Sequence, residues 1–439
     1  MAPACGDTFT DKAQEWLFMA VYNVFFHPLR KYPGSWIMAM SQLPIIYAKI
    51  TGVFPYWAID LHEKYGHVGR TAPNELSYSD ANSWKDIYAS HPDRPSGMAR
   101  DTSFFSSLDE PGTIPSMFNA NDKDHSRIRR TYARAFSKQA IAQQSSLIHQ
   151  HIRHMMDKLY EQRHHPIDLV HMFTFAMTDI MIDMQFGEPL GLLESTTHHS
   201  WARSQAGLLR NSTILAALGD LPVMRLLFQL ILPQLVRRAR ATHYGWMNKK
   251  LDDRLAMKTT RPDIVHFVME KAGPEATISE AELRVNLPLI MIAQTESTAT
   301  VLSGVVAFLL DNPRVLRELQ DEVRAHFKTS EEINVPATEK MPILNACINE
   351  TLRLYQGAPG ELPREVPKGG AMVSGEWVPG GTRVYNSSVA CFRSPRNFHD
   401  ATSWRPERWY SNASEEFSND DKEAWKPFGT GTRDCIGRQ

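Results

Sequence analysis

The pattern of apolar and polar positions predicts a mostly helical chain with a small β region. Residues 140–260 are largely helical in character. Short strands around a turn, followed by a helix, are predicted between Tyr65 and Ile87, and a second strand pair between Gly370 and Val384, where glycine and proline mark the turns. Residues 95–121 mix glycine and proline with apolar side chains, which predicts an irregular loop. We therefore expect a mainly α fold with a small β region.

One long apolar helix is predicted from residue 279 to residue 310. Ser279, with Glu282 three positions later, has the form of a capping box, which satisfies backbone N–H groups at a helix start. Asn312-Pro313 then opens the next helix, because proline suits the first helical position. Pro288 lies inside the predicted helix, where proline costs about 3 kcal/mol, so we expect a kink or a separate first segment.

The first 50 residues are predicted to form a membrane-proximal segment. The apolar run of residues 16–26 has 11 positions, whereas a spanning helix needs about 20, so this run cannot cross a bilayer alone. A stretch with two prolines and two basic residues follows at residues 27–34. Residues 35–58 are rich in Trp, Ile, Met, Leu and Tyr, which predicts either a segment lying at the membrane surface or an ordinary core helix.

Composition argues against two classes of protein. The 48 basic and 49 acidic residues give a net charge of -1, so the chain lacks the basic balance of a nucleic-acid-binding protein. The four cysteines, at positions 5, 347, 391 and 435, include no Cys-x-x-Cys pair. This spacing argues against a structural zinc site and a disulfide framework, and for a reducing compartment.

The candidate chemistry gathers at the C-terminal end of the chain. Cys435 follows Phe428-Gly429-Thr430-Gly431-Thr432-Arg433-Asp434 and precedes Ile436-Gly437. Glycines on both sides let the backbone turn tightly and approach a flat ligand, because glycine has no Cβ. The simpler alternative is a buried cysteine in a glycine-rich loop, since cysteine is among the most buried residue types.

This run matches at every position the Phe-x-x-Gly-x-Arg-x-Cys-x-Gly pattern of cytochromes P450, and the chain resembles that superfamily, in the style of its fungal microsomal branch. The resemblance implies the P450 fold, with residues 1–50 as a membrane-proximal segment that includes a Pro-rich hinge at residues 27–34, and with residues 51–439 as the haem-binding catalytic domain. It also implies haem b bound through Cys435 as the axial ligand of the iron, with Phe428 shielding the sulfur and Arg433 reaching a propionate.

Ala293-Gln294-Thr295-Glu296-Ser297-Thr298, inside the long predicted helix, resembles the family's oxygen-binding signature. Ala293 and Ser297 share a helix face because they are four residues apart. Two positions depart from the family pattern. Gln294 stands where the family has glycine and projects about 100° away from Ala293 around the helix. Ser297 replaces threonine, which keeps the hydroxyl but loses the branching that restricts its rotamers.

Further motifs complete the resemblance and assign the remaining site residues. His125 and Arg129 share one helix face, Glu350 and Arg353 lie one turn apart, and Arg408 belongs to a Pro-Glu-Arg run. The residues expected for haem binding are Cys435, Arg433, Phe428, Gly431, Gly437, His125, Arg129, Arg364 and Ala293; for catalysis, Glu296, Ser297 and Thr298; for a structural triad, Glu350, Arg353 and Arg408; and for the substrate pocket, Phe104, Phe105, Phe118, Leu289 and Leu362.

The resemblance implies a haem-thiolate monooxygenase that inserts one oxygen atom from O2 into a lipophilic small molecule, in secondary metabolism such as a terpenoid or polyketide pathway. The expected partners are NADPH-cytochrome P450 reductase, which supplies the flavins and NADPH electrons, and cytochrome b5. The expected location is the cytosolic face of the endoplasmic reticulum membrane. Val223 to Val236, with basic residues after it, is read either as a lid that touches the membrane or as a core helix.

Two rival functions stay open at this point. One is a P450-fold isomerase or peroxygenase, which works without a reductase; the retained Glu296 and Ser297 argue against it. The other is a shortened, non-catalytic haem-binding protein. The chain stops two residues after Gly437, where the family continues with a helix and a strand hairpin, and its N-terminal anchor is expected to be incomplete.

Overall fold

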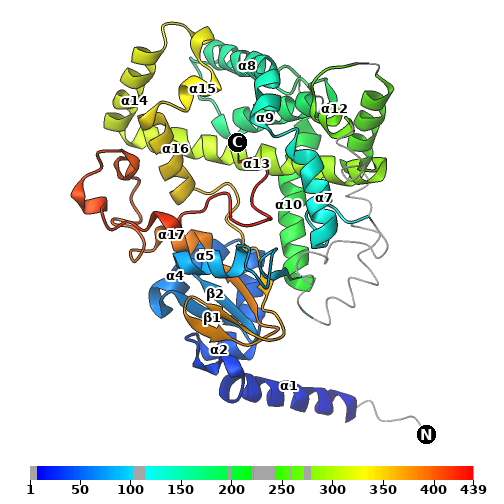
Figure 1. The fold of residues 1–439 in the computed structure, drawn as a ribbon, viewed down its shortest axis with the longest axis vertical. Helices are drawn as coiled ribbons and strands as arrows, with labels where there is room; N and C mark the ends of the chain where they lie inside the picture. The colour runs from blue at the N-terminus through cyan, green and yellow to red at the C-terminus, as the bar shows by residue number, and fades with distance from the viewer. Residues whose placement is uncertain are drawn as a thin grey trace.

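The computed structural model describes residues 7–101, 114–195, 197, 199–219, 221, 243–257, 259–270 and 278–438. A sheet-containing region carries the N-terminal end of the chain, and a larger helical region lies above it in the view of Figure 1. The helix α13 (Glu280–Asp311) crosses the helical region from side to side. The C-terminal segment ends beside α13, between the two regions. The mainly helical fold expected from the sequence is confirmed.

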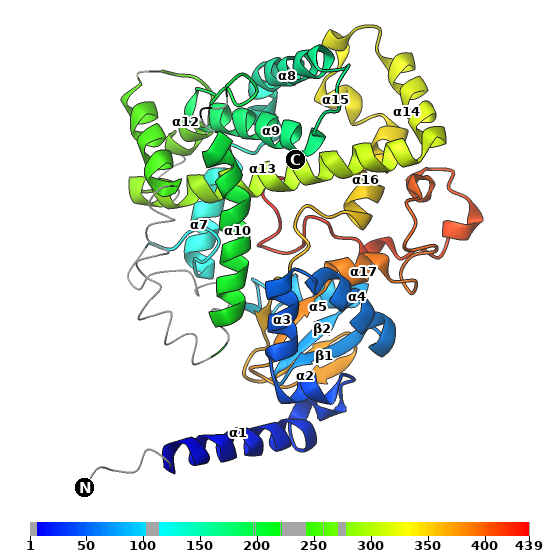
Figure 2. The ribbon, with the colours of Figure 1, turned by 180° about the vertical axis from the view of Figure 1, so that it is seen from behind.

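The helices fall into an N-terminal group, a central group and a group that follows α13. Their bounds are α1 (Asp7–Phe25), α2 (Trp36–Met40), α3 (Leu43–Thr51), α4 (Phe54–Tyr65), α5 (Ala81–Tyr88), α7 (Asp122–Ala133), α8 (Lys138–Glu161), α9 (Leu169–Phe186), α10 (His199–Gly219), α12 (Ile264–Met269), α14 (Pro313–His326), α15 (Val335–Thr338), α16 (Pro342–Leu354) and α17 (Ser388–Arg393). In Figure 2, α10 runs from the helical region down to the sheet region, where it contacts α3.

Two sheets form the β region. The larger one has the strand order β1-β2-β7-β4-β3, and its strands are β1 (Val68–Ala72), β2 (Glu75–Tyr78), β3 (Ala99–Arg100), β4 (Arg364–Glu365) and β7 (Arg383–Asn386). All of its pairings are antiparallel except that between β2 and β7, which is parallel. The predicted strand pair near residue 375 is present as β5 (Ala371–Val373) and β6 (Glu376–Val378).

The start of α13 agrees with the sequence prediction. The Ser279 hydroxyl accepts from the backbone N–H of Glu282, and the Glu282 carboxylate accepts from the backbone N–H of Ser279, which is the reciprocal pattern of a capping box. Of the two outcomes expected at Pro288, a kink or a separate first segment, the separate segment does not occur, because α13 is one continuous helix across that position. Pro288 is buried, and so are Leu287 and Ile290 beside it, so tertiary packing outweighs the local cost of the proline.

Two apolar cores position the site. The first joins β2 and β7 to α5 and α17, with Leu76, Ile87, Val384 and Phe392 each fully buried. The second joins α7, α9, α12 and α13, and Ile436 of the cysteine loop packs against it. The loop is therefore held from the helical region, although α5 of the sheet region also contacts it.

Among the residues that the structure describes, α13 is the one helix long and apolar enough by composition to span a membrane. It packs against α9 and α16, as the core helix of a folded domain does. The predicted lid segment, residues 223–236, lies outside the described residues, and so do Phe104 and Phe105.

Candidate active site

The cysteine loop is shaped by local hydrogen bonds and by two glycines in the left-handed region. The backbone N–H of Cys435 donates to the carbonyl oxygen of Phe428 at 2.8 Å, which closes the loop. Gly429 and Gly431 have φ values of 72° and 83°, which side chains other than glycine rarely adopt. A Cβ on Gly431 would lie 2.0 Å from the carbonyl oxygen of Tyr88. Gly431 therefore lets the loop touch the end of α5, whereas the sequence had suggested a close approach to the ligand.

Cys435 differs from the other described cysteines in its surroundings. Cys347 and Cys391 are buried, and Cys435 is exposed. Partial burial of the sulfur raises the pKa of Cys435, the backbone N–H of Gly437 lowers it by donating to the sulfur, and the Asp434 carboxylate raises it. The N–H donor favours the thiolate, which is the form that ligates a metal.

Arg129, on α7, clamps the loop one residue before the cysteine. Its guanidinium donates to the backbone carbonyl and to the carboxylate of Asp434, both at 2.5 Å. The fork of an arginine suits such two-point binding. The sequence predicted that Arg129 binds a haem propionate, whereas in the structure these two hydrogen bonds go to Asp434.

Three guanidinium groups gather beside the loop. Arg433 donates to the carbonyl of Ala120 and to the carboxylate of Asp122, both at 2.8 Å. Its Nη1 is buried and has no hydrogen-bond partner within the described part of the chain. Arg364 and Arg100 are close enough to Arg433 that the charges act on one another. Burial of the Arg100 guanidinium, followed by the positive charges of Arg364 and Arg433, lowers the pKa of Arg100 to about 9.

His125 faces the same cations. Its imidazole is buried, and this burial, followed by the charges of Arg433, Arg129 and Arg100, lowers its pKa to about 3. The ring is therefore neutral at physiological pH. Arg364 is buried and the Arg433 side chain is 7% exposed, so carboxylates of a ligand would meet these cations in a partly desolvated site.

The middle of α13 supplies polar groups on the side of the site. Ala293 and Thr298 are exposed, although Met291, Ile292 and Ala299 around them are buried. The hydroxyl of Ser297 donates to the carbonyl oxygen of Ala293 at 2.6 Å. The helix therefore presents a small residue and a hydroxyl together, as the sequence predicted.

Two further side chains of this segment, Glu296 and Gln294, differ in their surroundings. Glu296 is partly buried, and that burial raises the pKa of its carboxyl group. The amide nitrogen of Gln294 lies 3.5 Å from the position that a Cβ on Gly437 would occupy, and the same position is 3.9 Å from the Cys435 sulfur. Gln294 therefore reaches toward the cysteine loop.

The described residues fit a haem in three respects. An exposed cysteine sulfur receives a backbone hydrogen bond, Arg433, Arg364 and Arg100 offer charge for two propionates, and a helix with a small residue and a hydroxyl lies next to the loop, at Gln294 and Gly437. The Gln294 side chain of α13 thus reaches Gly437, which lies beside the Cys435 sulfur.

Comparison with known proteins decides the family. The family model described as cytochrome P450 matches residues 51–439. The chain belongs to the cytochrome P450 family. It is 38% identical to the cytochrome P450 monooxygenase aneG of Aspergillus aculeatus over 418 residues, which is 95% of this chain and 79% of the relative. It is also 38% identical to efuB of Hormonema carpetanum and 36% identical to astA of Talaromyces wortmannii, both named cytochrome P450 monooxygenases, over 83% and 84% of their lengths.

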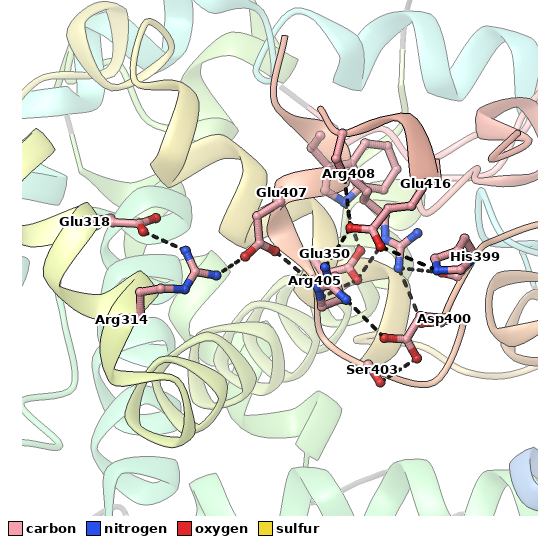
Figure 3. A network of polar contacts seen from close by, with 12 residues as sticks. Arg314, Glu318, Glu350, His399, Asp400, Ser403, Arg405, Glu407, Arg408 and Glu416 are labelled. Carbon is pink, nitrogen blue, oxygen red and sulfur yellow. Dashed lines mark hydrogen bonds and ion pairs between the residues drawn. The ribbon is translucent and has the colours of Figure 1, made fainter. Parts of the chain in front are cut away.

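The chain is therefore a P450 monooxygenase, as the sequence predicted, and family membership implies haem iron as its cofactor. The structure brings the expected Glu350, Arg353 and Arg408 together. Glu350 binds Arg353 at 2.7 Å and Arg408 at 3.1 Å, and all three side chains are fully buried. Figure 3 shows Glu350 and Arg408 of this centre and the ion pairs around them, including those of Arg405 with Asp400 and Glu416.

Sequence reasoning missed a fourth member of this P450 centre. The Asp420 carboxylate forms an ion pair with Arg408 Nη1 at 2.5 Å, and both side chains are fully buried. Two buried carboxylates thus balance two buried guanidiniums. Asp420 stands in a polar stretch with other acidic residues, and no motif distinguishes it there. Arg100 was missed as well, because no motif in the sequence distinguishes it.

The expected substrate-pocket residues are only partly described. Phe118 is 53% exposed, and the guanidinium of Arg100 lies 4.9 Å from its ring centre. Leu362 is also exposed, and Leu289 on α13 is half-buried. Phe118 and Leu362 thus offer apolar surface near the arginines of the site, since Arg364 donates to the carbonyl oxygens of Leu362 and Pro363.

Proposed function

We propose that Cys435 is the axial ligand of a haem b and that this P450 oxidises a lipophilic small molecule. Haem held by a thiolate supplies O2 activation, because the sulfur donates electron density that favours O–O cleavage. The net reaction consumes substrate, O2, NADPH and a proton, and yields the hydroxylated product, water and NADP+. The observation that carries the proposal is the exposed Cys435 sulfur with its Gly437 N–H donor, next to the oxygen-binding segment of α13.

The arginines hold the carboxylates of the haem in this proposal. Arg433, Arg364 and Arg100 supply charge, and the buried Nη1 of Arg433 supplies a donor that no other described residue accepts from. His125 is neutral and donates a single hydrogen bond at most to a propionate. Arg129 acts indirectly, because its hydrogen bonds to Asp434 hold the residue that precedes Cys435.

Ser297 and Glu296 deliver protons in this proposal, with Thr298 as the alternative hydroxyl. The Ser297 hydroxyl donates to the Ala293 carbonyl oxygen and would be the candidate proton donor on this face of α13 when haem is bound. Burial raises the pKa of Glu296, so its carboxyl holds a proton at a higher pH than an exposed glutamate does and can pass it toward the hydroxyl. Thr298 is exposed on the same stretch of helix.

The substrate and the setting are inferred from the surface and from the relatives. Phe118 and Leu362 offer apolar surface for a lipophilic substrate. Three fungal monooxygenases share more than a third of their aligned residues with this chain, which supports a role in fungal secondary metabolism, on a terpenoid or polyketide. NADPH-cytochrome P450 reductase is the proposed electron donor, with cytochrome b5 as a second one.

We place the protein at the cytosolic face of the endoplasmic reticulum membrane. The support is α1, where Trp16, Leu17 and Phe18 are each more than 60% exposed. A helix with this much exposed aromatic and aliphatic surface binds a lipid interface more readily than water. Trp36, Leu43 and Tyr47, on α2 and α3, extend the apolar surface.

The test of Cys435 is spectroscopic. We expect Cys435→Ser to abolish the red-shifted Soret band of the reduced carbon monoxide complex, because serine cannot supply a thiolate. Cys391→Ala is the matched control: Cys391 is buried and its sulfur contacts the Ala424 carbonyl, so the band should persist. A thiolate band retained in Cys435→Ser would show that the ligand is assigned wrongly. Product formed with hydrogen peroxide alone would favour a peroxygenase, and a rearranged product formed without O2 or a reductase would favour an isomerase.

A further inference from the structure

The segment that follows α16 touches α13 at two glycines. A Cβ on Gly304 of α13 would lie 2.6 Å from Cδ1 of Tyr355, and a Cβ on Gly357 would lie 2.7 Å from the carbonyl oxygen of Ser297. Gly304 and Ser297 are seven residues apart, which places them on the same face of the helix, two turns from one another. Residues 355–357 therefore lie along one face of α13, and their far end reaches the oxygen-binding segment.

The two contacts differ in what stands opposite the glycine. At Gly304 the nearest group is a tyrosine ring that is 46% exposed and can swing outward. At Gly357 the nearest atoms belong to Ser297 itself: the carbonyl oxygen, and then Cα and Cβ, both at 2.9 Å. Backbone atoms cannot rotate aside. Gly357 is not among the glycines with positive φ, so it is needed here for space rather than for its conformational freedom.

This contact restricts the hydroxyl that the proposed mechanism uses. Ser297 Oγ is held by the Ala293 carbonyl at 2.6 Å, and the backbone of residue 357 lies against the Cβ that carries it. A serine has no second branch to limit its rotation, whereas a threonine has one. We propose that Gly357 is a positioning residue: its backbone occupies the flank of Ser297 and limits the hydroxyl to the rotamer that faces Ala293. This inference rests on the proposed role of Ser297.

The segment is itself held from the other side. The Ser388 hydroxyl, at the start of α17, donates to the amide oxygen of Gln356 at 2.7 Å. The backbone N–H of Tyr355 donates to the carbonyl oxygen of Thr351 at 2.6 Å. The residues before Gly357 are thus bound to α16 and α17. These hydrogen bonds help to hold Gly357 in contact with α13.

The first test is Gly357→Ala in the haem-loaded protein. A Cβ at this position forces the segment and α13 apart, so Ser297 gains rotational freedom and proton delivery becomes less reliable. We expect the fraction of NADPH electrons released as hydrogen peroxide to rise about threefold or more, since small misplacements of reacting groups have large effects. We also expect a changed Soret position of the resting ferric protein, with the reduced carbon monoxide band retained.

Three further variants separate positioning from packing. Gly304→Ala introduces a methyl group between the same two segments, two turns from Ser297, and should leave the peroxide fraction and the Soret position unchanged. Ser388→Ala removes the hydrogen bond to Gln356 and loosens the segment without a steric clash. We expect it to raise the peroxide fraction, but less than Gly357→Ala does. This variant keeps the test informative if Gly357→Ala folds poorly. Adding Ser297→Thr to Gly357→Ala should lower the peroxide fraction again, because the branched residue restricts its own rotamer.

The outcomes distinguish this inference from the function it rests on. Equal peroxide fractions in Gly357→Ala and Gly304→Ala, with no rescue by Ser297→Thr, would show that Gly357 matters only for packing. An unchanged peroxide fraction in both Gly357→Ala and Ser388→Ala would overturn the inference, provided that Ser297→Ala still raises peroxide. If Ser297→Ala has no effect, the proposed role of Ser297 is wrong and the positioning role of Gly357 is wrong with it.

Discussion

At the scale of single residues, several arginines gather beside the cysteine loop, and one of them has a guanidinium nitrogen without a hydrogen-bond partner among the described residues. Arg433 is the central one. It is 7% exposed in its side chain, it binds Asp122 and the Ala120 carbonyl, and its Nη1 has no partner among the described residues. A buried donor without an acceptor costs about 1–3 kcal/mol, and a haem carboxylate would remove that cost.

We therefore expect Arg433→Gln to release haem faster. The loss of a charge-assisted hydrogen bond, about 1.5–3 kcal/mol, corresponds to a rate increase of roughly tenfold or more. Haem transfer to an acceptor apoprotein, followed by absorbance, measures the rate. Arg130→Gln is the control, because Arg130 is exposed on α7. Equal haem loss in the two variants would mean that Arg433 does not hold a propionate.

A second residue-scale prediction concerns acid stability. His62 is buried, with one ring nitrogen 2.9 Å from the Gly66 carbonyl and the other 2.8 Å from the Ser77 hydroxyl. Burial lowers the pKa of His62 to about 4. The unfolded chain, with its ordinary pKa of 6.5, binds this proton first, so the contribution of His62 to stability is present above pH 6.5 and is lost as pH falls toward 4.

The loss amounts to at most about 1.4 kcal/mol per pH unit in that window. We expect His62→Gln to flatten the fall in melting temperature between pH 7 and pH 5, even if it lowers the melting temperature at pH 7. His164→Gln, at an exposed position, should keep the slope of the native protein. Parallel slopes for the native protein and His62→Gln would contradict the assignment.

At the scale of elements, α16 is joined to the segment that leads to the cysteine loop by buried charge. Arg353 donates to the carbonyl oxygens of Phe392 and Ala401, and Arg408 links Glu350 to Asp420. The network in Figure 3 extends outward to exposed pairs, such as Arg314 with Glu318. The buried centre determines the path of residues 398–420, and the exposed pairs contribute little.

Asp420→Asn should therefore be costly. It leaves Arg408 with one buried carboxylate in place of two, and breaking a buried pair typically costs about 3–5 kcal/mol. We expect a lower melting temperature and a lower haem content after purification. Glu416→Gln, at the exposed end of the same network, removes a partner of Arg405 and should cost at most about 1 kcal/mol. Similar melting temperatures for the two variants would place Asp420 outside the essential centre.

The elements that the sequence predicted correctly have local signals. The capping box of α13 and the closed loop around Cys435 each lie within a few residues of sequence. The contacts that the sequence did not show depend on distant partners. Burial of Pro288 against neighbouring helices keeps α13 continuous, Arg129 binds Asp434 across 305 residues, and Arg100 joins the site because β3 pairs with β4. Spacing along the chain cannot show such contacts, because the fold creates them.

At the scale of the whole molecule, the two ends of the described chain meet in one sheet and one site. The sheet region combines β1 and β2 from the first 80 residues with β4 and β7 from beyond residue 360. The site likewise needs α7, α13 and the cysteine loop. Neither is complete until nearly all of the chain is present, so the sheet, the site and the helical region should fold as one unit.

The parallel pairing of β2 with β7 has a consequence for biosynthesis. Glu75 lies opposite Arg383, 308 residues later in the chain. At about 5–20 residues per second, a ribosome needs roughly 15–60 s to translate the intervening residues, and during this time the outer edge of β2 has no strand to pair with. Unpaired strand edges are sites of aggregation. The nascent chain therefore depends on a chaperone, or on rapid burial of the β1–β2 hairpin beneath α4 and α5, to remain soluble until β7 has been synthesised.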